Sequence, residues 1–269
     1  MKIIIIIPAR LESTRVPHKL LLPGPDNKPL LYFAWKQAIE SSANETYIAT
    51  DNTEVYQEAI KFGAKVIITK SNHICGTDRI AEAYNHIKRG THHGHDIDTD
   101  YIINLQGDEP EIRSEDINLL IDQFRNWGFT HWPKITTLAV PFHDFYQYSL
   151  PQNVKVVFDR LNKAIYFSRG RIPWVDIQNW KDNEPIAYKH IGIYAYTPKM
   201  LEKFTKTEVS QLEQIEGLEQ MRAIENHWPI LVIPINAPKN DHIWPLGINT
   251  RHDYDIWLSR TRIPDNIGY

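Results

Sequence analysis

The sequence predicts an α/β protein with a mostly parallel, Rossmann-like sheet flanked by helices and a small mixed or antiparallel extension in the second half. Residues 3–7 are five consecutive isoleucines. Continuous rather than alternating apolarity is typical of a parallel strand that is covered on both faces. Amphipathic stretches then alternate with short apolar runs over the first half, which is the pattern of a doubly wound sheet.

The predicted elements follow this alternation. Further strands are predicted at residues 46–50, 65–69, 101–105 and 135–140, with helices at 30–42, 53–62 and 114–127. In the last of these helices, Ile117, Leu120, Ile121 and Phe124 recur at helical spacing. The second half is less regular. Strands are predicted at 154–158, 164–167, 191–196 and 231–235, but helices only at 211–226 and 252–261.

Composition limits the classes of function. The chain has 269 residues, a net charge of −3 and one cysteine, Cys75. We expect one domain over residues 1–269 with two halves, 1–130 and 131–269. The weak net charge argues against a nucleic-acid or membrane partner. The apolar N-terminal run is far shorter than the ~20 residues of a membrane span, and no signal-peptide cleavage pattern follows it, so we expect a cytoplasmic protein.

The loop after the first strand carries a cluster of basic residues. It reads PARLESTRVPHK and holds Arg10, Arg15 and Lys19 with Ser13 and Thr14. Ligands of open parallel sheets bind beyond the carboxyl ends of the strands. Guanidinium, ammonium and exposed amide groups are what a triphosphate needs there. The loop is not a Walker motif, and the alternative is a solvated basic loop.

Two other loops have candidate polar groups. Asp108 follows an apolar strand and could hold Mg²⁺ against phosphate oxygens, although an Asp-Gly pair also suits a plain turn. Asp51 has the weaker claim, since it could cap the next helix. Gly76 and Thr77 begin a predicted helix whose first amides could bind a base edge or an anion, and Cys75 is expected to be a packing residue.

The second half offers Arg169 and His190, each beside a strand, as partners for a sugar carboxylate, although each alone could be a structural ion pair or a satisfied histidine. In the predicted helix 211–226, Glu213, Glu216 and Gln220 share a polar face that periodicity alone assigns to solvent. The opposite face is expected to be buried and consists of Leu212, Ile215, Leu218 and Met221. The histidine-rich segment 90–100 could bind a metal, but a polar surface loop is the favoured interpretation.

Taken together, these blocks resemble the 3-deoxy-manno-octulosonate cytidylyltransferase (CMP-Kdo synthetase) family. The resemblance spans nearly the whole chain. It rests, in order, on IIPARLESTRVPHK, YIATD, HICGTDRIAEA, NLQGDEPEI, VKVVFD, YFSRGRIPW, KHIGIYAY and LEQIEGLEQMR. It implies a nucleotidyltransferase that joins CMP from CTP to the anomeric hydroxyl of an eight-carbon 3-deoxy keto sugar acid and releases pyrophosphate. It also implies Mg²⁺ as cofactor and a homodimer formed through the second half.

The resemblance assigns roles residue by residue. Arg10, Lys19 and Asp108 would be catalytic, with Asp108 also binding Mg²⁺. The residues implied to bind the nucleotide are Ala9, Arg10, Ser13, Thr14, Lys19, Thr77 and Gln106. Those implied to surround the sugar acid are Gln106, Arg169, His190, Tyr194, Glu219 and Gln220.

Three departures from the family pattern matter. His18 stands where the family has glycine, so the loop is expected to close differently, because histidine adopts a positive φ less freely. Asn249 stands where the family commonly has a metal-binding Asp, and an amide oxygen is the weaker Mg²⁺ ligand. Asp253 or Asp241 could replace it. The unusual segment 239–246 admits another acceptor, such as an 8-amino or sialic-acid-like sugar. Because of Asn249, a second alternative is that the chain is a non-catalytic relative that binds CTP.

Overall fold

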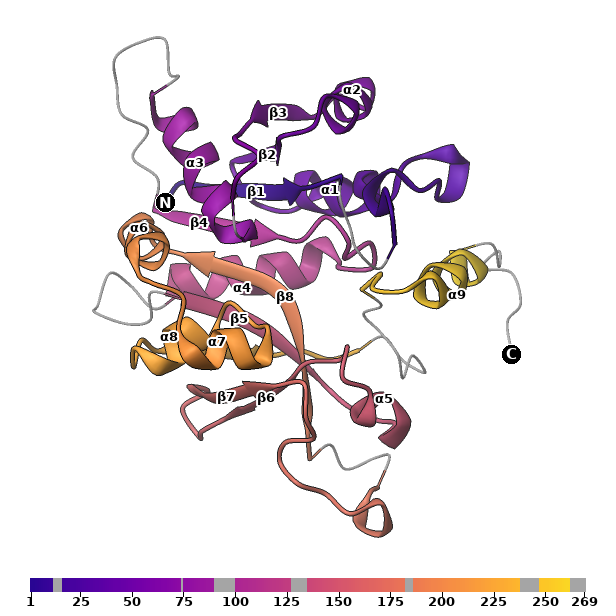
Figure 1. Cartoon of the computed structure of the whole chain (residues 1–269), viewed down its shortest axis with the longest axis vertical. Helices are drawn as coiled ribbons and strands as arrows, with labels where there is room; N and C mark the ends of the chain where they lie inside the picture. The colour runs from indigo at the N-terminus through magenta and orange to yellow at the C-terminus, as the bar shows by residue number, and fades with distance from the viewer. Residues whose placement is uncertain are drawn as a thin grey trace.

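The computed structural model describes residues 1–11, 16–73, 75–89, 100–126, 135–181, 186–237 and 247–261, leaving aside the side chains of 124–126. Within these residues, nine strands form one sheet (Figure 1). The order is β3-β2-β1-β4-β8-β5-β9, with β6 paired to β8 and β7 to β6. No helix in the described ranges is long and apolar enough to cross a membrane.

The first half of the sheet is parallel, as predicted. Strand β1 (Ile3–Ala9) pairs with β2 (Glu45–Thr50) and β4 (Tyr101–Leu105), and β2 pairs with β3 (Lys65–Ile68). Every residue of β1 is buried, and its isoleucines alternate between two cores. Helices α1 (Leu30–Glu40), α2 (Thr53–Lys61) and α4 (Ser114–Asn126) contribute to one core. Helix α3 (Gly76–Arg89) contributes to the other.

The second half adds the mixed extension. Strand β8 (Tyr188–Tyr196) is antiparallel to β4 on one side and to β5 (Ile135–Pro141) on the other. Strand β9 (Ile230–Pro234) is parallel to β5, while β6 (Lys155–Phe158) and β7 (Ala164–Ser168) form an antiparallel pair beside β8. The predicted fold class is therefore confirmed, down to a mixed extension in the second half.

Two short helices were not predicted. Helix α5 (Phe145–Ser149) has only five residues, too few for a helical period to be evident. Helix α6 (Pro198–Lys206) begins after Thr197, whose side chain accepts a hydrogen bond from the amide of Met200. Helix α9 (Arg251–Thr261) was predicted, and its Trp257 ring lies 5.1 Å from that of Phe33 in α1.

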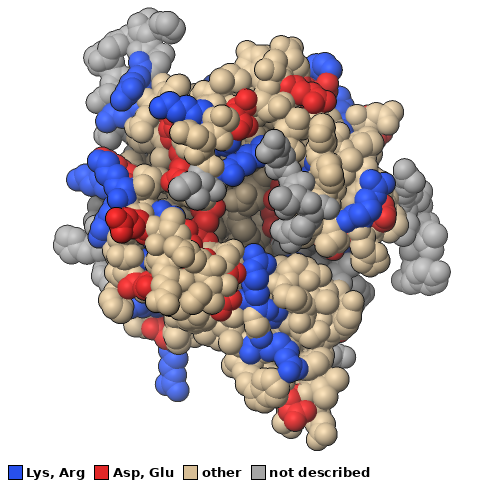
Figure 2. Space-filling view, viewed as in Figure 1, with Lys and Arg blue, Asp and Glu red and all other residues tan. Residues whose placement is uncertain are grey.

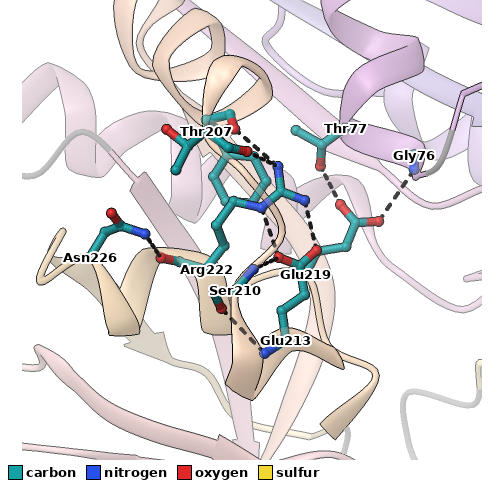
Figure 3. Close-up of polar contacts among 9 residues, drawn as sticks. Gly76, Thr77, Thr207, Ser210, Glu213, Glu219, Arg222 and Asn226 are labelled. Atoms are coloured by element: carbon teal, nitrogen blue, oxygen red, sulfur yellow. Dashed lines mark hydrogen bonds and ion pairs between the residues drawn. The ribbon is translucent and has the colours of Figure 1, made fainter. Parts of the chain in front are cut away.

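The prediction of one helix over 211–226 was wrong. Two helices occupy the segment, α7 (Gln211–Glu216) and α8 (Met221–Glu225), and Gly217 between them has φ +62°. The break removes the common polar face. Glu213 is buried and forms a two-pronged ion pair with Arg222, both N–O distances being 2.7 Å (Figure 3), while Ile215 is 70% exposed.

Candidate active site

The topology brings the predicted site residues to one edge of the sheet. Strands β1 and β4 are parallel, so the residues that follow Ala9 and Leu105 leave the sheet on the same side. Strand β8 runs the opposite way and enters the sheet there, with Ile193 opposite Leu105. His190 therefore lies just beyond the end of β4. Strand β7 ends close by, because Lys155 pairs with both Ser168 and Lys189.

Asp108 and Lys19 form the contact on which the metal prediction depends. Lys19 Nζ donates to the Asp108 carboxylate and, at 2.8 Å, to the carbonyl of Ile248. The amide of Ile248 donates in turn to the Asp108 carbonyl at 2.9 Å. Lys19 follows His18, which has φ +54° and so adopts the left-handed conformation despite carrying a Cβ. The basic loop and the β4 loop thus meet, as predicted.

The second candidate metal ligand lies in the same cavity. Asn249 is one residue past Ile248 and lines the cavity together with Asp108. Asp253 has another task, because its carboxylate accepts hydrogen bonds from the amides of Asn249 and Thr250 at the start of α9. This use argues against Asp253 as the replacement ligand. Asp241, the segment 239–246 and the histidine-rich segment 90–99 lie outside the described residues.

The cavity itself has a volume of about 390 Å³. The face shown in Figure 2 is hollowed near its middle, with acidic and basic side chains around the hollow. All the residues predicted to surround a sugar acid line this cavity. They are Gln106, Arg169, His190, Tyr194, Glu219 and Gln220. The predicted sugar side and the predicted metal ligands therefore share one chamber.

The nucleotide-side residues are placed less completely. Ala9 is buried at the end of β1, and Arg10 Nη2 donates to the carbonyl of His73 at 2.7 Å. Ser13 and Thr14 lie outside the described residues. Thr77 is buried and donates its hydroxyl proton to Glu219 at 2.6 Å, and the Gly76 amide donates to the same carboxylate at 3.2 Å (Figure 3). While this contact holds, the Thr77 hydroxyl can only accept a hydrogen bond from a base.

Arg169 is oriented by the break between α7 and α8. Its guanidinium donates to the carbonyls of Glu216 at 2.9 Å and Gly217 at 3.2 Å. The Glu216 carboxylate accepts hydrogen bonds from the Arg169 amide at 3.0 Å and from the Ser168 hydroxyl at 2.8 Å. Glu216 was predicted to face solvent, but it fixes the end of β7. Lys155 stabilises the same turn, because its ammonium donates a hydrogen bond to the Arg169 carbonyl at 3.1 Å.

Sequence reasoning missed two ionisable groups in the cavity, Glu109 and Lys189. Burial and the negative charge of Asp108 raise the pKa of Glu109 to about 8, against the attraction of Lys189 and Lys19. Burial lowers the pKa of Lys189, and Glu109 opposes this change. A Cβ added to Gly247 would come within 2.8 Å of the Glu109 carboxylate, so the glycine makes room for it. The position of Glu109 next to Asp108 was the only sign in the sequence that Glu109 belongs to the site.

The donor set suits a hard divalent cation. Asp108 and Asn249 supply a carboxylate and an amide oxygen to the cavity, and Glu109 supplies a carboxyl group that must lose its proton to bind a cation. The described residues contain no group of three or more His, Cys, Asp or Glu side chains that could enclose a metal ion. Carboxylate and amide oxygens are the ligands that hard divalent cations prefer.

Burial keeps the side chains of both Cys75 and His190 uncharged at pH 7. Cys75 is buried, and burial raises the pKa of its thiol well above the usual range, so it is a packing residue as predicted. Burial lowers the pKa of His190 to about 3. The imidazole is therefore neutral at pH 7 and can form hydrogen bonds with a ligand.

A parallel sheet whose carboxyl edge holds a cation–carboxylate pair beside a polar cavity is the arrangement of a nucleotide-binding α/β protein. Residues 4–230 match the family model described as Cytidylyltransferase. A 3-deoxy-manno-octulosonate cytidylyltransferase of Pelodictyon phaeoclathratiforme is 39% identical, over 95% of each chain. Its counterpart in Francisella tularensis subsp. novicida is also 39% identical, over 93% of this chain and 95% of the relative.

A solved structure agrees with these relatives. A CMP:2-keto-3-deoxy-manno-octonic acid synthetase complexed with CTP superposes with a TM-score of 0.80 at 30% identity, over 97% of this chain and 98% of that one. The chain belongs to the 3-deoxy-manno-octulosonate cytidylyltransferase family, as the sequence blocks predicted.

Proposed function

We propose that the protein transfers CMP from CTP to the anomeric hydroxyl of 3-deoxy-manno-octulosonate, or of a close analogue, and releases pyrophosphate. The names of its relatives support this reaction. The observation that carries it is the junction of the Lys19–Asp108 pair with the sugar-side cavity. Asp108, the partner of Lys19, lines the same cavity as the predicted sugar-side residues. A triphosphate held by Lys19 would therefore lie next to the sugar acid, as direct displacement between two bound substrates requires.

In this mechanism the chain acts by alignment and by neutralising charge. Arg10 and Lys19 hold the triphosphate and stabilise the departing pyrophosphate. Asp108, which lines the cavity, holds the Lys19 ammonium by an ion pair, while Arg169, His190 and Tyr194 orient the sugar acid. The buried Tyr194 hydroxyl has no hydrogen-bond partner among the described residues, so a ligand hydroxyl or carboxylate would satisfy it.

Nucleotidyltransferases of this kind use a divalent cation, and we propose Mg²⁺ here, held by Asp108 with Asn249 or Glu109. When bound, it would offset negative charge on the phosphates. No covalent enzyme intermediate is needed, because the sugar hydroxyl can displace pyrophosphate directly from the α-phosphorus.

We also propose a single nucleotidyltransferase domain over residues 1–269. Residues 1–130 would bind the nucleotide, and residues 131–269 would bind the sugar and form a homodimer. Large apolar side chains exposed around β6, β7 and the nearby turn support the dimer. They are Leu161, Ile165, Trp174 and Ile177. The predicted compartment is the cytoplasm.

The test is a coupled pyrophosphate assay with CTP or UTP and a panel of eight- and nine-carbon keto sugar acids. We expect turnover with CTP, 3-deoxy-manno-octulosonate and Mg²⁺. Asp108→Asn should lower kcat by roughly a hundredfold or more, because it removes the charge that holds both the cation and Lys19. Asp255→Asn, on the exposed side of α9, is the matched control and should be unaffected.

Three results would redirect the proposal. Turnover of only an 8-amino or nine-carbon acid would reassign the acceptor. Calorimetric binding of CTP without turnover under any metal would identify a non-catalytic relative. Full activity of the Asp108→Asn protein would remove the metal site from this edge of the sheet.

A further inference from the structure

Thr137 in β5 lies opposite an irregularity in β8. The register places Thr137 opposite Tyr194 but the next residue, Leu138, opposite Ile191, so β8 has two extra residues there. The irregularity turns two carbonyls toward one side chain. Thr137 Oγ1 lies 2.7 Å from the Ile193 carbonyl and 3.2 Å from that of Ile191. Thr137 is completely buried, so water does not compete for these contacts.

The same hydroxyl lies 3.0 Å from Nε2 of His190. A threonine hydroxyl has one proton to donate, and carbonyl oxygens can only accept. The proton is therefore committed to the carbonyls, and the Thr137 oxygen can contact His190 only as an acceptor. It follows that Nε2 of His190 carries a hydrogen and donates it.

The second ring nitrogen of His190 is left for a ligand. The contact with Thr137 is the side chain's one hydrogen bond among the described residues, and His190 lines the cavity. The ring packs against Phe167 and Tyr194, with centroids 5.1 Å and 5.2 Å away. Burial lowers the pKa of His190 to about 3, so the ring is neutral at pH 7. A neutral ring protonated at Nε2 has a lone pair at Nδ1. The charged groups that line the same cavity are Asp108, Glu109, Arg169, Lys189 and Glu219.

We propose that Thr137 is a positioning residue that holds His190 in the neutral, Nε2-protonated tautomer, so that Nδ1 accepts a hydrogen bond from a hydroxyl group of the acceptor sugar. His190 then selects for a hydroxyl donor rather than binding the sugar's carboxylate. The identity of that donor rests on the proposed function, whereas the tautomer does not.

The tautomer is tested in the free enzyme by NMR of ¹⁵N-histidine-labelled protein. The His190 signals are assigned by their loss in His190→Gln. We expect a pyrrole-like shift at Nε2 and a pyridine-like shift at Nδ1 at pH 7. Thr137→Val should change the balance of the two shifts, and Thr137→Ser should restore it. A Nδ1-protonated or doubly protonated ring in the wild type, or an unchanged spectrum in Thr137→Val, would overturn the proposal.

Thr136→Val is the matched control for these spectra. Thr136 is the adjacent residue of β5 and is equally buried, but its hydroxyl has no partner among the described residues. Removing this hydroxyl should leave both ring-nitrogen shifts of His190 unchanged. An effect equal to that of Thr137→Val would assign the change to general repacking of β5 and would also overturn the proposal.

Kinetics test the hydroxyl ligand. Thr137→Val should raise the KM for the sugar acid roughly tenfold, the effect of about one hydrogen bond, and leave the KM for CTP unchanged. Across acceptors lacking one hydroxyl each, the effect should disappear for a single analogue, the one without the His190 partner. An equal effect on every analogue would overturn the hydroxyl assignment. If no keto sugar acid is turned over while the tautomer is as expected, the proposed function fails and the role of Thr137 stands.

Discussion

At the residue scale, Asn249 departs from the pattern that the resemblance implies. It lines the cavity together with Asp108, at a position where the resemblance implies a metal-binding carboxylate. An amide oxygen is neutral and binds Mg²⁺ more weakly than a carboxylate does. The chain should therefore need more free metal than a relative with Asp at this position.

Asn249→Asp tests this dependence. We expect the Mg²⁺ concentration for half-maximal rate to fall several-fold, because a second negative charge would face the cation. The measurement is a metal titration of the pyrophosphate assay at saturating CTP and sugar acid. An unchanged or higher metal requirement would mean that residue 249 does not contact the ion.

Lys155 predicts a pH dependence of stability. It is fully buried and donates to the carbonyls of Leu150 at 2.7 Å and Arg169 at 3.1 Å. Burial, aided by Arg169 and Arg171, lowers the pKa of Lys155 from 10.5 to about 8. Between these two pH values the unfolded chain holds the proton that the folded protein has released, so folding becomes more favourable as the pH rises.

To test this, the wild type and Lys155→Met are unfolded with denaturant at pH 7.5 and at pH 10. The free energy of unfolding of the wild type relative to the variant should increase over this interval, by up to ~3 kcal/mol. The neutral amine keeps two N–H groups for its two carbonyls, so deprotonation does not break these contacts. A difference that falls or stays constant would contradict the prediction.

Individual residues were predictable only where the type of residue and its place after a strand coincided. Asp108 and Lys19 met both conditions, and they are in contact. Thr137 and Lys155 lie within strands and did not meet the second condition, and nothing in the sequence separated Glu109 from its neighbour Asp108 as a further site residue. The roles of Glu109, Thr137 and Lys155 depend on Gly247, on the β8 irregularity and on the turn at Arg169, and these partners are distant in the sequence. Periodicity reports which face of an element is buried, but not which carbonyl or carboxylate lies opposite.

At the element scale, the break between α7 and α8 shapes the sugar side of the cavity. The apolar spacing through 211–226 suited one helix, but Gly217 takes a left-handed conformation and ends α7. Glu216 can then reach Ser168 and Arg169, while the buried Glu213–Arg222 pair holds the two short helices together (Figure 3). Local spacing does not reveal such a break, because the packing of the two helices stabilises it.

Gly217→Ala should weaken both folding and sugar binding. An alanine at φ +62° costs about 1–2 kcal/mol in the folded state, and relief of that strain would shift the carbonyls that hold Arg169. Gly63→Ala is the matched control, since Gly63 has φ +87° and open space around it. Both variants should lose stability, but only Gly217→Ala should raise the KM for the sugar acid. If the two variants have the same KM for the sugar acid, the break between α7 and α8 does not affect sugar binding.

At the scale of the whole molecule, Glu219 connects the two halves of the chain. It lies between α7 and α8, lines the cavity, and accepts hydrogen bonds from Gly76 and Thr77 at the start of α3 (Figure 3). The start of α3 belongs to the half that we propose binds the nucleotide. One carboxylate therefore touches both the sugar side of the cavity and a segment implied to read the base.

We expect Glu219→Ala to reduce the effect of one substrate on the binding of the other. Calorimetry of CTP with and without the sugar acid measures this effect as a ratio of two dissociation constants. The ratio should move toward one in Glu219→Ala and stay unchanged in the control Glu202→Ala, an exposed residue paired with Lys206. A ratio unaffected by Glu219→Ala would mean that the halves communicate elsewhere.

The class of fold could be predicted from the sequence, but the order of the strands in the sheet could not. The isoleucine run of residues 3–7 and the alternation after it were enough for the parallel half. The insertion of β8 between β4 and β5 was not, because residues 188–196 are separated from both partners by long stretches of sequence. Pairing between strands so far apart is set by the global packing rather than by any local pattern.

The central position of β8 has a consequence for the growing chain. While a ribosome is still making residues 188–196, strands β4 and β5 have both been synthesised, yet each lacks the neighbour that separates them in the finished sheet. Strands β4 and β5 then present three unsatisfied backbone edges, one on β4 and both on β5, because β9 also follows β8 in the sequence. Such edges are prone to pair with other chains. Newly made protein should accordingly be most vulnerable to aggregation when about two thirds of its length has emerged, and β8 should protect two of the three edges once it is in place.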